Sequence, residues 1–347
     1  MVKQILVIQL RQLGDILLTT PCARELKQAY PGASITFLCH PMGKMILEGN
    51  PSIDHIVTYD PKDSWRSEWT LLRNLHKQNY DLVLDFMYNP RSAIYAFATR
   101  SPRRLAFPSR RSMFFTEIVP KLAHREYIVR EKFLYLRALG LEPRSERLDL
   151  PWCAEHARWV TQWMQNEASF REASLRVILS PTHRREVRQW PLERFARLAD
   201  RLQSEWGATP IWVWGPGEED FVREVQRLCE RPSLLAPKSS FREMAALIAH
   251  ADLFVGNSNG PSHVAVASDT PSLQLHGPTF ALSWCPCTER HKAVQADSSN
   301  LMTSVSEADV WRAMEELRPL AEASAKARGQ TVRSHWQEPR GDADHTR

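Results

Sequence analysis

The chain has 347 residues, of which 43% are hydrophobic and 24% are charged, and its formal net charge at pH 7 is +5. These values are typical of a globular protein with two domains, and they exclude a fibrous or mostly disordered chain. Six cysteines are too sparse for a small secreted domain held by disulfides, and the positive charge favours anionic partners.

The location of the protein is predicted from its apolar stretches. The opening run Ile5–Leu10 has the length of a strand, and Arg11 and Asp15 follow it, so it does not have the form of a secretion signal. The longest uncharged stretch, residues 270–288, contains three prolines and cannot form a spanning helix. We therefore expect a cytoplasmic protein whose contact with a membrane is peripheral.

The first half of the chain alternates short apolar runs with helical patterns, which is typical of parallel βαβ units. A helix is expected from Gly14 to Tyr30, where Pro31 and Gly32 follow. The other predicted elements are strands at 5–9, 34–39, 55–59 and 82–86 and helices at 68–78 and 126–139.

A polar segment with Gly140, Pro143 and Pro151 and a helix near 155–167 separate this half from a second α/β half. The second half has predicted strands at 176–180, 210–214 and 253–255 and helices at 192–206, 218–229, 241–250 and from 306 to about 320. We predict domains at 1–165 and 166–322 and a disordered tail at 323–347. Both domains are expected to be Rossmann-like and doubly wound, and to face a cleft that holds the ligand.

The turn after the first strand reads Arg11-Gln12-Leu13-Gly14-Asp15 and leads directly into a helix. Asp15 is therefore predicted at the carboxyl end of a central strand, where reacting groups gather. Two other interpretations remain open here. The carboxylate could only cap the helix, and the turn could bind a dinucleotide, although Gly14 is its only glycine.

Two segments of the second half are predicted to bind an anion. The stretch from Thr182 to Arg188 follows a strand and is rich in arginine, which can hold a diphosphate, although a solvated basic loop is the alternative. Later, Asn257, Ser258, Asn259 and Gly260 form a turn that opens a helix, whose amides and dipole favour a pyrophosphate. His263 in its first turn could bond a phosphate or sugar oxygen, or could simply cap or pack.

Cys285 and Cys287 with His291 look like half of a zinc site. No second pair of ligands accompanies them at a suitable spacing, so we predict no metal.

Taken together, these segments resemble glycosyltransferase family 9, the lipopolysaccharide heptosyltransferases, over roughly residues 3–320. The stretch from Arg11 to Pro21 is similar to the opening motif of the family, whose aspartate is regarded as the catalytic base, which gives Asp15 that role. Residues 188–191 resemble a motif whose basic residue binds the donor phosphates, which is Arg188 here. Trp214-Gly215 with Glu218 resembles a segment near the donor ribose, and residues 255–263 with 277–279 resemble the stretch that binds the donor nucleotide sugar.

The resemblance implies an inverting, metal-independent enzyme of the GT-B fold with no cofactor apart from its ADP-sugar donor, heptose being the expected sugar. The second domain would bind the donor through Thr182, Arg188, Glu218, Asn257, Ser258, Asn259, Gly260 and His263. The first would hold the inner core of lipopolysaccharide through Arg11, Arg103 and Arg104, the last two in a basic loop at 100–111, at the cytoplasmic face of the inner membrane.

The chain departs from the family pattern at one point. The family usually has Asp followed by Ser or Thr before the glycine, whereas this chain has Ser258 and Asn259. This leaves two alternatives open, a transferase with a different donor sugar and an impaired member that binds a nucleotide sugar or glycolipid. Nucleic-acid binding is not expected, because the arginine clusters come with no recognised motif or aromatic platform.

Overall fold

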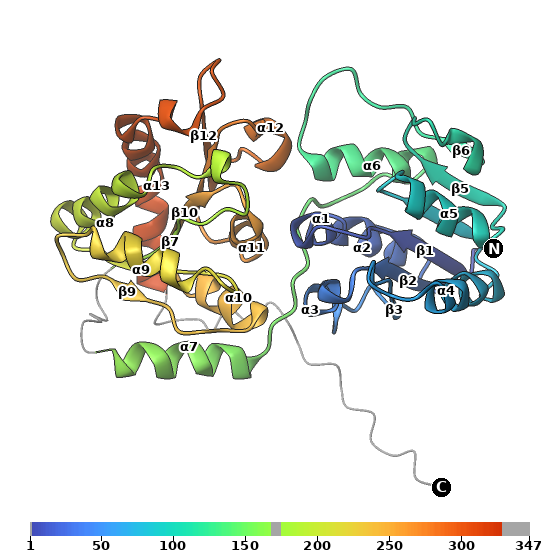
Figure 1. The fold of residues 1–347 in the computed structure, drawn as a ribbon, viewed down its shortest axis with the longest axis horizontal. Coiled ribbons are helices and arrows are strands. Elements are labelled where there is room, and N and C mark those ends of the chain that lie inside the picture. The colour runs from blue at the N-terminus through green and yellow to red at the C-terminus, as the bar shows by residue number, and fades with distance from the viewer. Residues whose placement is uncertain (1, 168–174, 328–347) are drawn as a thin grey trace, which may run out of the picture. The chain divides into compact units, whose positions relative to one another are not determined.

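The computed structural model describes residues 2–167 and 175–327, which form two compact α/β units, residues 1–151 (unit 1) and 152–347 (unit 2) (Figure 1). Unit 1 contains one parallel sheet with the strand order β3-β2-β1-β4-β5-β6. Its strands are β1 (Gln4–Ile8), β2 (Ser34–Cys39), β3 (His55–Thr58), β4 (Leu82–Asp85), β5 (Arg103–Ala106) and β6 (Glu117–Ile118). Its helices are α1 (Leu13–Leu17), α2 (Thr20–Ala29), α3 (Lys44–Leu47), α4 (Trp65–Lys77), α5 (Pro90–Ala98) and α6 (Ile128–Ala138), with short 3₁₀ turns η1 (Pro41–Gly43) and η2 (Ser112–Phe114).

Unit 2 contains a second parallel sheet, ordered β12-β11-β10-β7-β8-β9. Its strands are β7 (Arg176–Ser180), β8 (Thr209–Trp212), β9 (Leu234–Leu235), β10 (Leu253–Asn257), β11 (Ser272–His276) and β12 (His291–Gln295). Its helices are α7 (Ala154–Asn166), α8 (Leu192–Trp206), α9 (Glu219–Arg227), α10 (Phe241–Ala249), α11 (Gly260–Ala267), α12 (Ala281–Trp284) and α13 (Glu307–Ala327), with 3₁₀ turns η3 (Glu186–Arg188) and η4 (Met302–Ser304). Counted within each unit, the two sheets share the order 3-2-1-4-5-6 of a doubly wound fold, as predicted.

The centre of each sheet is closely packed, because helices cover both faces and the central strands β1, β4, β7 and β10 are buried apart from the first residue of β1 and of β7. At Gly256 on β10 a β-carbon would lie 2.8 Å from the Cβ atom and 2.9 Å from the carbonyl oxygen of Ser180. Only glycine fits there, so this residue lets β10 approach β7 at the carboxyl end of the sheet.

The single helix predicted at 14–30 is two helices, because Pro21 has no N–H and begins a new helix in its first turn. The hydroxyl groups of Thr19 and Thr20 donate to the carbonyl oxygens of Asp15 and Leu17, both over 2.7 Å, and so satisfy acceptors at the break. The break fixes the short helix α1 that carries Asp15.

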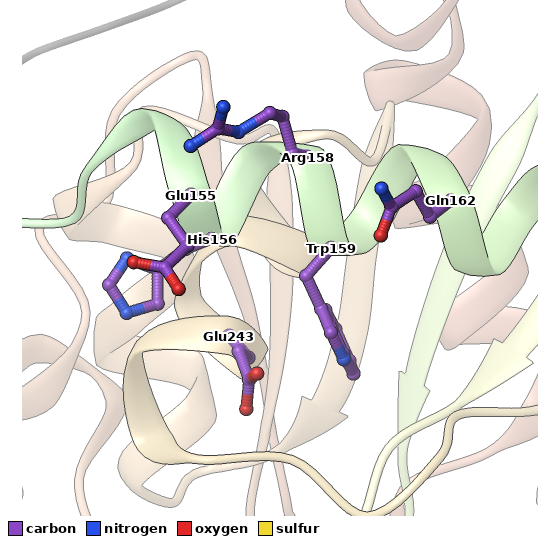
Figure 2. A pocket seen from close by; sticks show the side chains of 6 residues that line it. All are labelled: Glu155, His156, Arg158, Trp159, Gln162 and Glu243. Atoms are coloured by element: carbon purple, nitrogen blue, oxygen red, sulfur yellow. The ribbon is translucent and has the colours of Figure 1, made fainter.

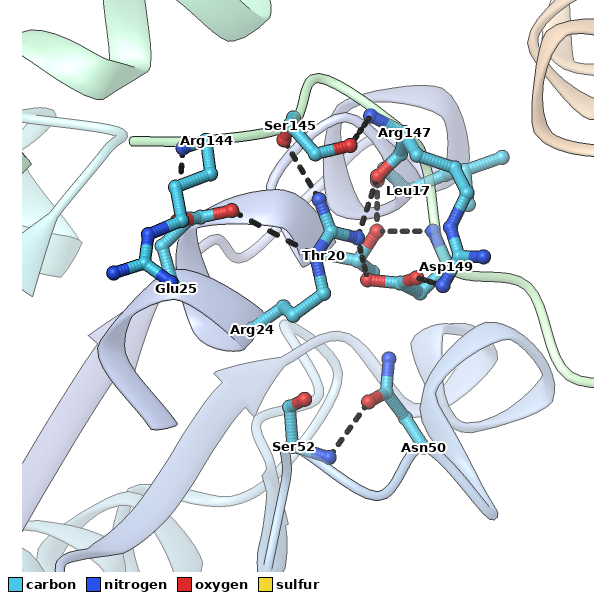
Figure 3. A network of polar contacts seen from close by, with 10 residues as sticks. All are labelled: Leu17, Thr20, Arg24, Glu25, Asn50, Ser52, Arg144, Ser145, Arg147 and Asp149. Carbon is cyan, nitrogen blue, oxygen red and sulfur yellow. Dashed lines mark hydrogen bonds and ion pairs between the residues drawn. The ribbon is translucent and has the colours of Figure 1, made fainter. Parts of the chain in front are cut away.

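The boundary between the units lies at 151/152, earlier than the predicted 165/166. Figure 3 shows why residues 144–149 belong to unit 1: Arg24 of α2 donates to the carbonyl oxygens of Ser145 and Arg147, both over 2.7 Å, and pairs with Asp149. The Asp149 amide also donates to the Thr20 hydroxyl over 2.9 Å. Helix α7 instead packs against α10, and so belongs to unit 2.

Two other predictions need correction. The stretch predicted as a basic loop at 100–111 contains β5, because Arg103 pairs with Glu117 of β6 over 2.7 Å and joins the sheet. The last helix continues to Ala327, five residues into the predicted tail that starts at 323, and residues 328–347 lie outside the described residues. No helix among the residues described is long and apolar enough to cross a membrane.

Candidate active site

The strand order places one candidate site in each unit. In a doubly wound sheet the chain leaves the first and fourth strands in opposite directions, and ligands bind outside the carboxyl ends of these two strands. In unit 1 these strands are β1 and β4, and in unit 2 they are β7 and β10. The sequence-predicted residues Asp15, Thr182 and Asn257 all lie at or just after such strand ends.

Asp15 lies in the first turn of α1, where its Oδ2 atom accepts a hydrogen bond from the Gln12 amide over 3.3 Å. Burial raises the pKa of this half-buried carboxyl above its usual range, while the Lys132 ammonium and the Gln12 amide oppose the shift. A raised pKa makes a carboxylate a better proton acceptor. Capping the helix and accepting a proton are therefore compatible roles.

Lys132 of α6 is a site residue that the sequence analysis missed. Its side chain is only 4% exposed, and its Nζ atom donates to the Oε1 atom of Gln9 over 3.0 Å and to the Thr19 hydroxyl over 2.9 Å. Among the described residues it forms no ion pair, which is rare for a buried ammonium group. Thr19 in turn bonds the backbone oxygen of Asp15, so Lys132 supports the helix that carries the carboxylate.

A pattern in the sequence could have revealed this lysine. Val129, Lys132, Phe133 and Leu136 form the buried face of α6 at helical spacing, and a lysine on an apolar helix face calls for an explanation.

Asp85, the last residue of β4, is a second group that the analysis missed. Its Oδ1 atom accepts from the amides of Met87 and Tyr88 over 2.9 and 3.0 Å. Burial raises the pKa of this fully buried carboxyl to about 6, against hydrogen bonds from Ser92, Met87 and Tyr88 and the charge of Lys132. The unit 1 site thus combines two carboxyl groups with one buried cation.

The three predicted acceptor-binding arginines are placed differently. Arg11 is exposed in the same turn as Asp15. Arg103 and Arg104 lie on β5, where Arg103 pairs with Glu117 and the Nε atom of Arg104 donates to the Phe114 carbonyl over 3.0 Å. Their contact with an acceptor stays a prediction.

In unit 2 the loop after β7 presents a partly buried cation. The guanidinium Nε atom of Arg188 is buried and has no hydrogen-bond partner among the described residues. Burial lowers the pKa of Arg188, and the charges of Arg185 and Arg184 lower it further. No ion pair within the described part of the chain involves these three arginines, so an anion would relieve their mutual repulsion.

Asn257 and Asn259 hold the loops of this site together. The Asn257 side chain accepts from the Trp190 amide over 3.0 Å and donates to the Pro181 carbonyl over 2.7 Å. Asn259 donates to the backbone oxygen of Thr182 over 2.9 Å and caps α11 through the Ser262 amide over 3.2 Å. Their direct contact with a donor, and that of the buried Thr182, stays a prediction.

The start of α11 leaves the Gly260 amide available as a hydrogen-bond donor. Pro261 has no amide hydrogen and the Ser262 amide is capped, but the Gly260 amide has no partner within the described residues. A β-carbon at Gly260 would meet nothing within 4 Å, so the space beside it is open. This end of the helix can receive an anion.

Two buried imidazoles lie near this helix start. Burial lowers the pKa of His263 to about 4, and burial followed by the charges of His263 and Arg188 lowers the pKa of His276, which the sequence analysis missed, to about 3. The Nδ1 atom of His263 and the Nε2 atom of His276 have no hydrogen-bond partner among the described residues. Both rings are therefore neutral at pH 7, with polar atoms available to a ligand.

The remaining predicted donor residues have partners within unit 2. The Ser258 amide donates to the Leu275 carbonyl over 3.1 Å, and its half-buried side chain lies in the turn before α11. The carboxylate of Glu218 accepts from the Gly215 amide over 2.9 Å, which fixes the loop before α9. Contact of either side chain with the nucleotide-sugar donor stays a prediction.

Two other places on unit 2 are polar but are not part of this site. A hollow of about 480 Å³ lies between α7 and α10. Figure 2 shows the side chains that line it, Glu155, His156, Arg158, Trp159, Gln162 and Glu243. Glu243 and His156 bond the backbone amides at the starts of their own helices, so both are occupied as caps.

The second place is around Cys285, Cys287 and His291. The Nδ1 atom of His291 bonds the Ser272 hydroxyl over 2.9 Å. Within residues 2–167 and 175–327 no cluster of three or more possible metal ligands was found.

The profile of glycosyltransferase family 9 (heptosyltransferase) matches residues 68–312, which is more than half of the chain. The chain belongs to glycosyltransferase family 9. Lipopolysaccharide heptosyltransferase 3 of Escherichia coli K12 is 29% identical to it over 298 residues, which cover 81% of this chain and 84% of the relative. The protein is therefore a glycosyltransferase, as predicted.

Solved structures of a family 9 glycosyl transferase and of heptosyltransferases share the fold. A family 9 glycosyl transferase from Veillonella parvula has a TM-score of 0.80 and 23% identity, covering 91% of this chain and 97% of its own. The E. coli heptosyltransferase WaaC with ADP has a TM-score of 0.68 and 20% identity, covering 92% and 99%. These similarities confirm the predicted GT-B fold.

Proposed function

We propose that this family 9 protein transfers a heptosyl group from ADP-heptose to the inner core of lipopolysaccharide, with inversion and without a metal ion. The observation that carries the proposal is the half-buried Asp15 after β1, whose carboxylate interacts electrostatically with the buried ammonium group of Lys132. The names of the relatives, lipopolysaccharide heptosyltransferases, support the substrate class.

In the proposed step the Asp15 carboxylate takes the proton of an acceptor hydroxyl, whose oxygen attacks the anomeric carbon of the donor. The bond from that carbon to the diphosphate oxygen breaks, and ADP leaves with its electron pair. Attack from the side opposite the diphosphate inverts the anomeric centre. The proton stays on the carboxyl group, whose raised pKa favours that state.

Unit 2 would hold the donor. Arg188 and the Gly260 amide can bond the diphosphate and stabilise its growing charge, and this cationic set is our reason for proposing a mechanism without a metal. The neutral His263 and His276 can bond uncharged sugar or phosphate oxygens nearby. Structures of the E. coli heptosyltransferase WaaC with ADP and with ADP-2-deoxy-2-fluoro heptose support this choice of donor.

Unit 1 would hold the acceptor, with the exposed Arg11 beside Asp15 as the first candidate for an anionic group. Such an acceptor is anchored in lipid, so we place the enzyme in the cytoplasm and in peripheral contact with the inner membrane.

A transfer assay tests the proposal. Purified protein is incubated with ADP-heptose and heptose-deficient lipopolysaccharide core in buffer with and without EDTA, and ADP release and the glycolipid mass are measured. We expect ADP release that depends on the acceptor, a mass gain of one heptose, an inverted anomeric configuration by NMR and no effect of EDTA. Product of retained configuration, or transfer that EDTA abolishes, would contradict the mechanism.

The serine at position 258 favours a second candidate function, transfer of a different sugar. A serine side chain is shorter than aspartate and uncharged, which leaves room for another substituent or a bridging water. Thermal shift with ADP-, UDP- and GDP-sugars tests the choice, because a bound ligand raises the unfolding temperature. If another nucleotide sugar stabilises the protein more than ADP-heptose and is transferred, the heptose assignment is wrong.

A further inference from the structure

The outer surface of one helical layer of unit 1 is unusually apolar. Trp65 and Trp69 of α4 are 74% and 68% exposed, Phe97 of α5 is 53% exposed, and Met113 of η2 is 80% exposed. Ile94, one turn before Phe97 on α5, is exposed as well. Large apolar side chains gathered on neighbouring elements, rather than scattered singly, indicate an interaction surface.

These elements are neighbours within one layer of unit 1. Glu68 of α4 accepts a hydrogen bond from the Tyr95 hydroxyl over 3.1 Å and pairs with Arg91 over 3.6 Å, both on α5. The rings of Phe97 and Phe114 lie 5.5 Å apart, which joins α5 to η2. Buried residues of α4 and α5 also share one hydrophobic cluster, so both helices cover the same face of the sheet (Figure 1).

The two tryptophans do not contribute to the core of unit 1. Helix α4 buries Leu75 and packs Leu71 and Leu72 against the cluster, whereas Trp65 and Trp69, four residues apart, lie on an exposed face. Two exposed indoles cost free energy in water, which a partner that covers them would recover.

The charges around this surface favour an anionic partner. The Arg66 guanidinium lies 5.4 Å from the centre of the Trp65 ring, and that of Arg104 lies 5.8 Å from Phe97. Other cationic side chains on these elements are Arg73 and Lys77 of α4 and Arg91 of α5, which pairs with Glu68. Arg100 follows α5, and Arg110 and Arg111 lie just before η2. The acidic side chains on the same segments are Asp60 and Asp63, before α4, and three that have partners. Glu68 is engaged by Tyr95 and Arg91, Asp81 accepts from the amides of Lys3 and Gln4, and Glu117 pairs with Arg103.

We propose that this aromatic and basic surface, formed by α4, α5 and η2, docks unit 1 onto an anionic phospholipid bilayer. Tryptophan favours the boundary between lipid and water, and each arginine or lysine near an anionic bilayer adds electrostatic attraction. Because α4 follows β3 in a parallel sheet, its first residues, Trp65 and Arg66, lie toward the carboxyl edge of the sheet. Asp15 lies at the same edge. The inference rests on the proposed function in one respect, which is that the acceptor is anchored in lipid.

Sedimentation with vesicles tests the surface independently of catalysis. The full chain is mixed with vesicles of phosphatidylethanolamine and phosphatidylglycerol, or of phosphatidylcholine alone, and the bound fraction is measured. We expect binding to the anionic vesicles only, and a loss of about tenfold or more for the double variant Trp65→Ala with Trp69→Ala. Arg66→Glu with Arg73→Glu should weaken binding at low salt, because it reverses two charges.

The control variant is Leu282→Ser with Leu301→Ser, which removes two exposed apolar side chains of unit 2 and should bind vesicles normally. Circular dichroism verifies that each variant is folded. Equal binding by the tryptophan variant and the wild type would overturn the proposal. So would sedimentation of the wild type as a dimer that the tryptophan variant loses, since a second copy would then cover this surface.

Transfer assays distinguish this proposal from the proposed function. With a water-soluble acceptor that lacks the lipid, the tryptophan variant should transfer as fast as the wild type, and with the acceptor in vesicles it should be slower. If no heptose is transferred at all, the proposed function fails while the vesicle result still decides the docking surface.

Discussion

The two units have the same strand order, yet the chemistry at their strand ends is opposite. At the carboxyl ends of β1 and β4, unit 1 presents Asp15 and Asp85 with the buried ammonium of Lys132. At the ends of β7 and β10, unit 2 presents Arg188 and the buried, neutral His263. The topology therefore decides where a ligand binds, and the side chains at those ends decide what the site does.

The comparison assigns proton transfer to unit 1 and anion binding to unit 2. A carboxyl group with a raised pKa can accept a proton, whereas a cation without a counter-ion and an unpaired helix amide can hold a diphosphate. If the division is correct, changes in unit 1 lower turnover without weakening nucleotide binding, and changes in unit 2 weaken that binding.

The largest expected effect is that of Asp15→Asn. The amide oxygen of asparagine can still accept the Gln12 hydrogen bond, so the turn should keep its conformation. Because asparagine cannot take up the proton, turnover should fall by about a hundredfold or more. Steady-state transfer kinetics and calorimetry with ADP measure the two quantities. Near-normal turnover, or an equal loss of ADP affinity, would break the division between the units.

Arg188→Ala should weaken ADP binding by about 2–4 kcal/mol, since a charge-assisted contact is lost in a partly buried site. Arg201→Ala is the matched control, because Arg201 lies on α8 of the same unit and forms an exposed pair with Glu205. Calorimetry is the measurement. Equal ADP affinities for wild type and Arg188→Ala would remove Arg188 from the donor site.

Lys132→Met keeps the length of the side chain and removes its charge. Asp15, Cys22, Glu131 and Asp85 are the ionisable groups that interact with Lys132, and loss of the cation should raise the pKa of Asp15. The acidic limb of the pH profile of kcat should then move to higher pH, and turnover at pH 7 should fall by about tenfold. KM for the donor should not change.

Lys121→Met, at an exposed lysine, is the control for this variant. Lys132→Arg should recover part of the rate if charge is what matters. A lower kcat with an unshifted pH profile would show that Lys132 only packs.

The smallest expected effect is the change in the free energy of unfolding as the pH falls. His276 has a pKa of about 3 in the folded protein against an ordinary value of 6.5, so the unfolded chain binds more protons in mild acid. The stability that comes from keeping this ring neutral is complete above pH 6.5 and is lost as the pH falls below that value. The slope is at most about 1.4 kcal/mol per pH unit for one group.

The stability that Asp85 of unit 1 contributes should change with pH in the opposite direction. Its pKa is raised to about 6, so its contribution to stability increases as the pH falls through 6 towards 4. Unfolding temperatures between pH 7 and pH 5 test both. His276→Gln should reduce the loss in acid, and Asp85→Asn should remove the gain. Parallel profiles for all the variants would contradict the contrast between the units.

Much of the fold could be predicted because its signals are local. The strands at 34–39 and 176–180 and the helix at 192–206 were predicted with their observed bounds. Short apolar runs and helical spacing depend only on residues that are close in the sequence. Other features depend on distant partners. The strand at 103–106 is polar at its start and is fixed by Glu117, and the unit boundary is fixed by the bonds of Arg24. Neither the strand nor the boundary can be predicted from a short stretch of neighbouring residues.

The sequence by itself determined that two doubly wound α/β units exist and that Asp15, Arg188 and the turn at 257–260 follow central strands. It did so because the apolar periodicity and turn residues act over a few positions. Only the tertiary structure decided that the charges of Lys132 and Asp15 interact, although the chain between them is more than a hundred residues long, and that the charges of His263 and Arg188 act on His276. The physical reason is burial: desolvation and charge depend on which elements pack together, and a pKa is set by those neighbours rather than by the residue alone.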